Sequence, residues 1–246
     1  KKIKAVIGVD YAGHPCDWIA LRYLANRYNF MLINDNCHAL GSKYYKSLQY
    51  STKYADLVTQ SYHAVKNITT GEGGAVLTNN KYFYEKIKYL RSHGMIRDKK
   101  KLSKGSEGWF YEMKNLGYNF RLSEIQCALG ISQLKKLDKF IKKRNKIAEI
   151  YNNLLAKNEK LTVPYVSSQV THSYHLYPLQ INFKKLKITK KLFYNHLLKK
   201  GIFLNVHYIP VHTQPYYKKK YKFKNDNLEN AMNFYENEFS LPIHPN

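Results

Sequence analysis

The chain of 246 residues has few cysteines, few arginines and no long hydrophobic run, and each shortage excludes a class of protein. Its three cysteines, Cys16, Cys37 and Cys127, are odd in number and form no CxxC or Cys/His cluster. This pattern excludes a disulfide framework, predicts no metal site and indicates a reducing compartment, so we expect a cytoplasmic protein. No apolar run approaches the ~20 residues that a membrane span requires, and no signal-peptide pattern opens the chain.

Acidic residues are also scarce. The chain has 41 Lys and Arg residues against 17 Asp and Glu, which gives a net charge of +24 at pH 7. Such a charge raises the hypothesis of nucleic-acid binding. However, only six of the 41 basic residues are arginine, the forked group on which base and phosphate recognition relies most. We therefore expect no nucleic-acid partner, and we interpret the charge as a basic surface that attracts an anionic small molecule.

The first half of the chain alternates between strand and helix patterns. Short apolar runs predict strands, and helix-like spacing predicts helices. The predicted strands are residues 5–9, 30–33, 55–61 and 75–78, and the predicted helices are residues 17–28 and 81–93. This alternation predicts a mostly parallel sheet covered on both faces. Residues 98–115 are polar and predict a loop.

The second half begins with a helical region. Residues 123–126, Ser-Glu-Ile-Gln, match a capping box that starts a helix, and apolar residues recur at helical steps as far as Leu154. The basic run 142–146 predicts either an exposed face or a break between helices. The elements predicted beyond it are strands at 175–183 and 202–206 and helices at 189–200 and 228–239. We expect a large domain over residues 1–150 and a small α/β domain over residues 151–246.

Three polar segments, residues 33–41, 61–74 and 117–124, contain the chemically capable side chains. Asp35 ends a predicted buried strand, where open α/β sheets bind their ligands. Lys66 lies between a strand end at Ser61 and a glycine-rich turn, a setting in which a partly desolvated amine could attack a carbonyl. Each residue also has an ordinary structural interpretation: Asp35 as a turn or cap residue, His38 as a semi-buried histidine, and Lys66 as one lysine among 35. The residue types alone leave both interpretations open.

The three segments together resemble the DegT/DnrJ/EryC1/StrS family of pyridoxal-phosphate-dependent nucleotide-sugar aminotransferases. The resemblance runs from Val9–Gly13 through Val206–Pro210 to Ser240–Pro242, and residues 61–74 are its most diagnostic stretch. Within the family, Val9–Gly13, Arg91–Met95 and Leu129–Lys136 resemble the aminotransferases of pseudaminic acid synthesis. The resemblance implies an α/β fold of type I, like that of aspartate aminotransferase. Because the chain begins at Lys1 and the family's N-terminal segment has no counterpart, we expect a piece of a longer protein.

The resemblance also implies roles for the matched residues. Lys66 matches the lysine that forms a Schiff base with the cofactor and carries a proton to the substrate. Asp35 matches the carboxylate that pairs with the cofactor's ring nitrogen and so maintains it as an electron sink. His38 matches a residue beside the ring, and Ser61 matches a phosphate ligand.

Further matched residues concern the substrate and the assembly. Asn119 matches a residue that reaches cofactor and substrate in the neighbouring subunit, which implies a homodimer with shared active sites. Asn205, Val206, His207 and Tyr208 match a segment that lines the sugar-nucleotide site.

The implied reaction transfers an amino group from L-glutamate to a UDP-linked 4-keto-6-deoxy amino sugar, for pseudaminic acid or a related surface glycan. The alternatives are an aminotransferase for a different sugar, a sugar dehydratase of the same fold and an inactive fragment or binding module. Lys66 disfavours the dehydratase, because dehydratases of this family have histidine at that position.

Two pairs of residues depart from the family pattern. Asn36-Cys37 stands where small residues such as Ala or Ser are usual, and Thr59-Gln60 replaces an apolar–aromatic pair before Ser61. We expect both pairs to lie close to the cofactor and to alter the packing there.

Overall fold

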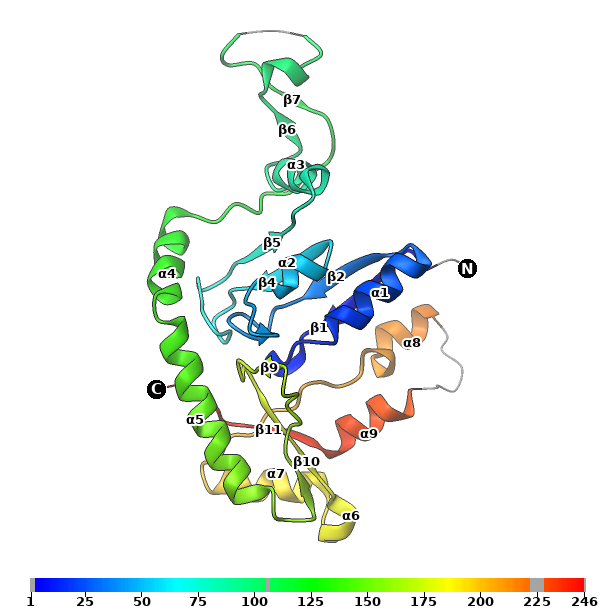
Figure 1. Ribbon diagram of the computed structural model, residues 1–246, viewed down its shortest axis with the longest axis vertical. Coiled ribbons are helices and arrows are strands. Elements are labelled where there is room, and N and C mark those ends of the chain that lie inside the picture. Colours follow the sequence, from blue (N-terminus) through cyan, green and yellow to red (C-terminus); the bar gives the residue numbers. More distant parts are fainter. Residues whose placement is uncertain (1–2, 105–106, 222–227, 246) are drawn as a thin grey trace.

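The computed structural model describes residues 3–104, 107–221 and 228–245 and contains two main sheets (Figure 1). The first sheet has the strand order β1-β2-β4-β5, formed by Ala5–Val9, Met31–Asp35, Leu57–Ser61 and Gly74–Leu77. Strands β1, β2 and β4 are parallel, and β5 is antiparallel to β4. This confirms the predicted mostly parallel sheet.

Two helices pack on one face of the first sheet: α1, Trp18–Tyr28, and α2, Tyr50–Tyr54. Trp18 is fully buried in this layer with Leu32 and Val58 of the sheet. Asp17 caps α1 by accepting a hydrogen bond from the Ala20 amide. On the opposite face Ile7 and Val9 are 62% and 45% exposed, so the described helices leave this face open, and the predicted cover is found on one face of the sheet only within the described residues.

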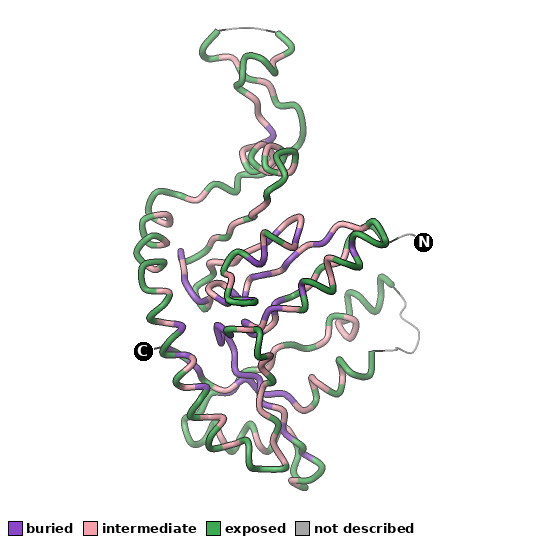
Figure 2. The backbone as a smooth tube through the Cα atoms, in the orientation of Figure 1, coloured by how far each residue is buried: buried purple, intermediate pink, exposed green. Residues whose placement is uncertain are grey.

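The second sheet is built around β10, Tyr177–Ile181, which pairs in antiparallel fashion with β11, Glu238–Leu241, and β8, Leu161–Thr162. Its helices are α6, Phe183–Leu186, α7, Lys190–Lys199, and α9, Glu229–Asn237. Thr189 caps α7 as predicted, since its hydroxyl accepts from the Leu192 amide. Figure 2 shows buried backbone concentrated in β10 and β11, the centre of the second hydrophobic core.

The predicted strand at 202–206 is wrong. This segment forms only an isolated bridge, in which Asn205 and Ser240 exchange two backbone hydrogen bonds of 3.3 and 2.8 Å. Its apolar residues serve packing instead, because Leu204 is buried in the second core and Val206 packs against that core. Burial in this core explains the apolar residues of the segment, so they do not require that the segment pair with a neighbouring strand.

Helices α4, Glu124–Leu134, and α5, Leu137–Leu155, run along one side of both sheets (Figure 1). The predicted capping box is confirmed, with Ser123 and Gln126 each bonding the other's backbone. Of the two alternatives for 142–146, the break is wrong, because the helices are separated at Lys135–Lys136 instead. The exposed face is confirmed for Lys142, Lys143 and Lys146 but is wrong for Arg144, which is buried. The expected domain boundary at residue 150 lies inside α5.

The segment from α3, Lys81–Leu90, to the short strands β6, Met95–Ile96, and β7, Glu112–Met113, projects away from both sheets at the top of Figure 1. Strand β7 lies within the predicted loop 98–115, of which residues 105–106 are outside the described residues.

The remaining short elements connect these parts. Strand β3, Lys43–Tyr44, pairs with β9, Val170–Thr171, and so links the first half of the chain to the second. Helix α8 spans Pro215–Tyr221, and 3-10 turns occupy Tyr11–Gly13, Lys99–Lys101 and Val211–Thr213. Among the described residues, no helix combines the length and hydropathy needed to cross a lipid bilayer.

Candidate active site

Asp35 is the last residue of β2 and lies on the open face of the first sheet. Its register partners are Val9 on β1 and Thr59 on β4, so these side chains form one row across the carboxyl ends of the parallel strands. One carboxylate oxygen of Asp35 accepts a hydrogen bond of 3.1 Å from the Cys37 amide. Asp35 therefore stabilises the following turn and also lies at the sheet edge where α/β proteins bind ligands.

Lys66 lies in the loop that joins β4 to β5. The loop is closed by hydrogen bonds from the Tyr62 amide to Gly73 O at 2.8 Å and from the Thr70 amide to Tyr62 O at 3.0 Å. A Cβ atom on Gly73 would lie 2.3 Å from the Thr70 hydroxyl, so the closed loop requires glycine there. Lys66 is partly buried, and this burial lowers the pKa of its amine, although Cys37 and Asp35 act in the opposite direction. The neutral amine is therefore more accessible than on a surface lysine.

His38 is buried between the two halves of the chain. Its Nδ1 accepts a hydrogen bond of 3.3 Å from the Ala12 amide, so the proton of the neutral ring is on Nε2. Nε2 then donates to the Tyr208 hydroxyl, 3.3 Å away. Burial, together with the charge of Lys66, lowers the pKa of His38 to about 4, so the ring is neutral at pH 7.

His207 completes the cluster from the last quarter of the chain. Its amide donates to a Glu238 carboxylate oxygen at 3.0 Å, and its carbonyl accepts from the Tyr11 hydroxyl at 2.6 Å. Burial lowers the pKa of His207, and Lys66 is close enough to lower it further. The structure thus brings together five predicted residues from distant parts of the sequence: Asp35, His38, Lys66, His207 and Tyr208.

The other predicted residues lie around or outside this cluster. Ser61 ends β4, five residues before Lys66, and its hydroxyl accepts from the His63 amide at 3.4 Å. Asn205 is exposed beside the second sheet, and Val206 packs against its core. Asn119 is exposed next to the projecting segment, where it forms an isolated bridge with Ser92. Within the described part of the chain, no hydrogen bond joins Asn119 to the cluster.

Sequence reasoning missed Asp10, which is fully buried at the end of β1. Its carboxylate accepts hydrogen bonds of 2.8 to 2.9 Å from the Cys16 amide, the Trp18 indole, the Asn36 amide group and the Tyr50 hydroxyl. The only signal in the sequence is an acid at the end of a short apolar run, a signal that Asp35 shares.

The residues that depart from the family pattern contact one another. Gln60 donates a hydrogen bond of 3.3 Å to the Asn36 side chain, and the Cys37 sulfur lies 3.7 Å from the Thr59 carbonyl oxygen. The two unusual pairs therefore form one contact between the ends of β2 and β4.

Sequence reasoning also missed Glu238, Ser240 and His175. Glu238 and Ser240 alternate along β11, and His175 places its ring 4.4 Å from that of His38. A period-two pattern reveals that two side chains share a face, but it does not reveal which distant residue they contact.

The cluster has the donor set that pyridoxal phosphate requires. Asp35 offers a carboxylate for a protonated ring nitrogen, Lys66 offers a partly desolvated amine for the aldehyde, and Ser61 offers a hydroxyl for the phosphate. All three side chains belong to the carboxyl edge of the first sheet or to the loop that leaves it. These residues fit the cofactor.

Comparison with known proteins agrees with this geometry. Residues 1–246 match the DegT/DnrJ/EryC1/StrS aminotransferase family. The chain is 43% identical over 245 residues to the uncharacterized protein MJ1066 of Methanocaldococcus jannaschii, covering 100% of this chain and 63% of that protein. It is 42% identical over 242 residues to UDP-4-amino-4,6-dideoxy-N-acetyl-beta-L-altrosamine transaminase of Campylobacter jejuni. This match covers 98% of this chain and 61% of that protein.

Solved structures give the same result. PseC of Helicobacter pylori, an aminotransferase involved in the biosynthesis of pseudoaminic acid, has a TM-score of 0.87 at 36% identity and covers 99% of this chain and 62% of that one. The putative sugar aminotransferase Spr1654 of Streptococcus pneumoniae in its PLP form has a TM-score of 0.82 at 29% identity, covering 98% and 63%. The chain spans less than two thirds of the length of these relatives. It has the type I fold of pyridoxal-phosphate-dependent aminotransferases and belongs to the DegT/DnrJ/EryC1/StrS aminotransferase family.

Proposed function

We propose that this protein is a pyridoxal-phosphate-dependent aminotransferase that transfers an amino group from L-glutamate to a UDP-linked 4-keto-6-deoxy amino sugar. The observation that carries the proposal is the partly desolvated amine of Lys66 beside the carboxylate of Asp35, in a chain of this family. Relatives that are 38% and 42% identical are named UDP-4-amino-4,6-dideoxy-N-acetyl-beta-L-altrosamine transaminases, which supports the sugar class and a place in pseudaminic acid or related glycan synthesis.

The roles proposed for the residues follow from their chemistry. Pyridoxal phosphate supplies the electron sink that lets a proton leave the substrate carbon. Asp35 holds the cofactor's ring nitrogen in its protonated form, and Lys66 binds the cofactor and moves the proton with its Nζ atom. The Ser61 hydroxyl binds the phosphate. Neutral His38 orients Tyr208 at the edge of the site, because its Nε2 donates to the Tyr208 hydroxyl.

The substrate and the assembly form part of the same proposal. Asn205, Val206, His207 and Tyr208 line the sugar-nucleotide site, and Asn119 reaches the site of a second subunit in a homodimer. The position of Asn119 supports this, because it is exposed outside the cluster, between Tyr118 and Phe120, which are 57% and 69% exposed.

Three free cysteines support a reducing, cytoplasmic setting. The separate cores of the two sheets support two domains, proposed at 1–150 and 151–246, although α5 crosses this boundary and its residue Ala148 belongs to the second core.

Two substitutions test the proposal through the rate of amino transfer. Lys66→Ala is expected to abolish turnover, because no other side chain of the cluster supplies both the amine and the proton. Asp35→Asn is expected to retain the cofactor but to lower kcat about 10²- to 10³-fold, because a neutral ring nitrogen accepts electrons poorly.

The matched control is Lys81→Ala, which removes an exposed lysine at the start of α3 and is expected to leave the rate unchanged. A Lys66→Ala protein that transfers amino groups at the wild-type rate contradicts the proposal.

A further inference from the structure

A buried acid that the proposed reaction does not use lies behind the cluster. Glu238 on β11 has no exposed surface, and within the described part of the chain it forms no salt bridge. Its two oxygens accept separate hydrogen bonds, one of 2.6 Å from the Ser240 hydroxyl and one of 3.0 Å from the His207 amide. One oxygen therefore binds the His207 segment directly, and the other binds Ser240, which itself contacts His207. A buried acid with this arrangement indicates that the position of His207 matters.

The residue held in this way is His207, which is fixed at three points. Glu238 binds its amide, Tyr11 donates to its carbonyl oxygen at 2.6 Å, and Ser240 contacts its ring Nδ1 at 2.8 Å. In addition, the backbones of Ser240 and Asn205 pair directly, which holds β11 against the segment that precedes His207. Such a fixed ring is pre-organised for a contact of defined direction.

The donor and acceptor roles of the His207 ring follow from the number of hydrogens that Ser240 can donate. Burial raises the pKa of Glu238, whereas the hydrogen bonds from Ser240 and His207 and the charge of Lys190 act in the opposite direction and favour the carboxylate. Ser240 has a single hydroxyl hydrogen, and toward the ionised Glu238 it is directed to the carboxylate. The Ser240 oxygen is then an acceptor toward His207, so Nδ1 of His207 carries the ring proton. Burial, with the nearby charge of Lys66, lowers the pKa of His207 and keeps the ring neutral. Nε2 of His207 is therefore left as a lone-pair acceptor.

His38 is the opposite tautomer, with its ring proton on Nε2. Its Nδ1 accepts from the Ala12 amide, so its Nε2 is a donor. Two of the neutral histidines of the site therefore differ, since His38 has a donor Nε2 and His207 an acceptor Nε2, and both are close enough to Lys66 for its charge to lower their pKa values.

We propose that Glu238 and Ser240 are positioning residues that hold His207 in its Nδ1-protonated form, so that Nε2 accepts a hydrogen bond from a substrate hydroxyl. This role rests on the proposed function for the identity of the substrate. The nucleotide sugar offers hydroxyl donors, whereas the main donor of L-glutamate is the α-amine, which is the group transferred in the proposed reaction. The hydroxyl therefore belongs to the sugar nucleotide.

The tautomer is tested by nitrogen NMR of protein labelled with ¹⁵N-histidine, recorded without cofactor, so that the result does not depend on the proposed function. His207→Gln identifies the signals of His207 among the 10 histidines. We expect His207 protonated at Nδ1 and His38 protonated at Nε2. Ser240→Ala is expected to release the Nδ1 form of His207, and Ser240→Thr, which keeps the hydroxyl, is expected to retain it.

Ser42→Ala is the matched control, because Ser42 is also buried but donates to Gly13 O at 2.7 Å, away from His207. This variant is expected to leave the His207 signals unchanged. An Nε2-protonated His207 in the wild-type protein, or unchanged His207 signals in folded Ser240→Ala, overturns the proposal.

Kinetics test the substrate contact. Loss of one neutral hydrogen bond corresponds to about fivefold in affinity, so Ser240→Ala is expected to raise KM for the sugar nucleotide about fivefold and to leave KM for L-glutamate unchanged. Ser240→Thr is expected to restore the wild-type value. Equal changes in both KM values, or no change in either, overturn the assignment of Nε2 to the sugar. A protein in which Lys66→Ala has no effect refutes the proposed function instead and leaves the NMR result standing.

Discussion

A chain of buried and half-buried polar residues lies at the strand ends on the side opposite Asp35 and Ser61. Asn36 donates to Asp10 at 2.9 Å and accepts from Gln60 at 3.3 Å, and Gln60 in turn accepts from the Tyr62 hydroxyl at 2.8 Å. Successive side chains of a strand point to opposite faces, so this chain lies on the side opposite the site. It fixes the end of β2 against the end of β4 and thereby fixes Asp35 relative to the loop of Lys66.

The contact between Asn36 and Gln60 is tested by a double-mutant cycle on the free energy of unfolding. Asn36→Ala is expected to cost about 1–3 kcal/mol, because the buried Asp10 carboxylate loses one of its donors and the Gln60 amide group loses its acceptor. Gln60→Leu is expected to be less damaging in the Asn36→Ala background, with a coupling of about 1 kcal/mol in urea denaturation. Asn36→Ala combined with Gln169→Ala, an exposed position, is expected to be additive. Additivity of Asn36→Ala and Gln60→Leu contradicts the coupling.

At the scale of single residues, the sequence predicted the members of the cluster through a resemblance, and the structure brings five of them together. The roles of these residues remain predictions. Glu238 and Ser240 were not predictable, because a contact with a residue 31 or 33 positions away leaves no local pattern. The same reason hid Asp10, whose partner Tyr50 is 40 positions away.

At the scale of elements, α5 shows why the prediction of an exposed face at 142–146 holds for the lysines but not for Arg144. Helical periodicity places Lys142 and Lys143 on the exposed side and Arg144 on the buried side, at 5% exposure. The Arg144 guanidinium donates to the carbonyl oxygens of Tyr174, His175 and Ile243 at 2.9 to 3.2 Å. A charge run that looks uniform in sequence therefore contains the residue that attaches α5 to the second sheet.

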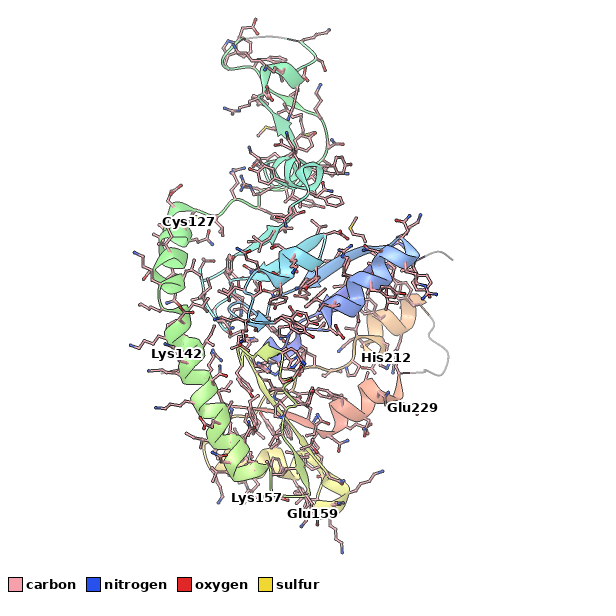
Figure 3. All side chains as sticks on the ribbon, viewed as in Figure 1. Cys127, Lys142, Lys157, Glu159, His212 and Glu229 are labelled. Carbon is pink, nitrogen blue, oxygen red and sulfur yellow. The ribbon has the colours of Figure 1, made fainter. Side chains whose placement is uncertain are left out.

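Arg144→Met is expected to lower the free energy of unfolding by about 2–4 kcal/mol, because three buried carbonyl groups lose their donor while the volume is largely kept. Lys142→Met is the matched control on the same helix, since Figure 3 shows Lys142 on the outer side of α5. It is expected to change stability by less than about 0.5 kcal/mol. Both values come from urea denaturation, and equal effects of the two substitutions contradict this account of α5.

Whether the other elements were predictable also depended on whether they leave a local signal in the sequence. Strands β1, β2, β4 and β10 and the caps of α4 and α7 were predictable, because apolar runs and capping residues are local signals. Strands β3, β6, β7, β8 and β9 were missed, since each has two residues and shows no alternation. Strand β11 was missed because its first two residues were predicted as the end of the helix at 228–239, whereas α9 ends at Asn237. The expected strand at 202–206 failed because its apolar residues enter the second core rather than a ladder.

At the scale of the whole molecule, the cluster lies where the two halves of the chain meet. Asp35, His38 and Lys66 come from the first sheet and its loops, whereas His207 and Tyr208 come from the segment beside β11. This meeting depends on tertiary contacts such as the pairing of β3 with β9 and the span of α5. Local patterns therefore predicted the two halves but not their junction.

The proposed homodimer is tested by mixing inactive protomers. If each site combines Lys66 of one subunit with Asn119 of the other, Lys66→Ala mixed with Asn119→Asp yields hybrids with one intact site. The expected recovery is about one quarter of wild-type activity, because half of the dimers are hybrids with one working site each. The aspartate is chosen because its charge repels the cofactor phosphate.

The control for this experiment mixes Lys66→Ala with Asp35→Asn. Both residues belong to the same protomer, so every hybrid site lacks one of them, and little beyond the residual Asp35→Asn activity is expected. Mixed Lys66→Ala and Asn119→Asp proteins that form hybrids but recover nothing contradict the shared site.

The central claim, that Lys66 is the residue that binds pyridoxal phosphate, is tested most directly by mapping the bond. The protein is incubated with pyridoxal phosphate, reduced with borohydride, digested and analysed by mass spectrometry. We predict that the peptide containing Lys66 carries the reduced cofactor in close to one copy per chain, and that Lys66→Ala abolishes this label. A label spread over many of the 35 lysines, or concentrated on a lysine other than Lys66, would contradict the account.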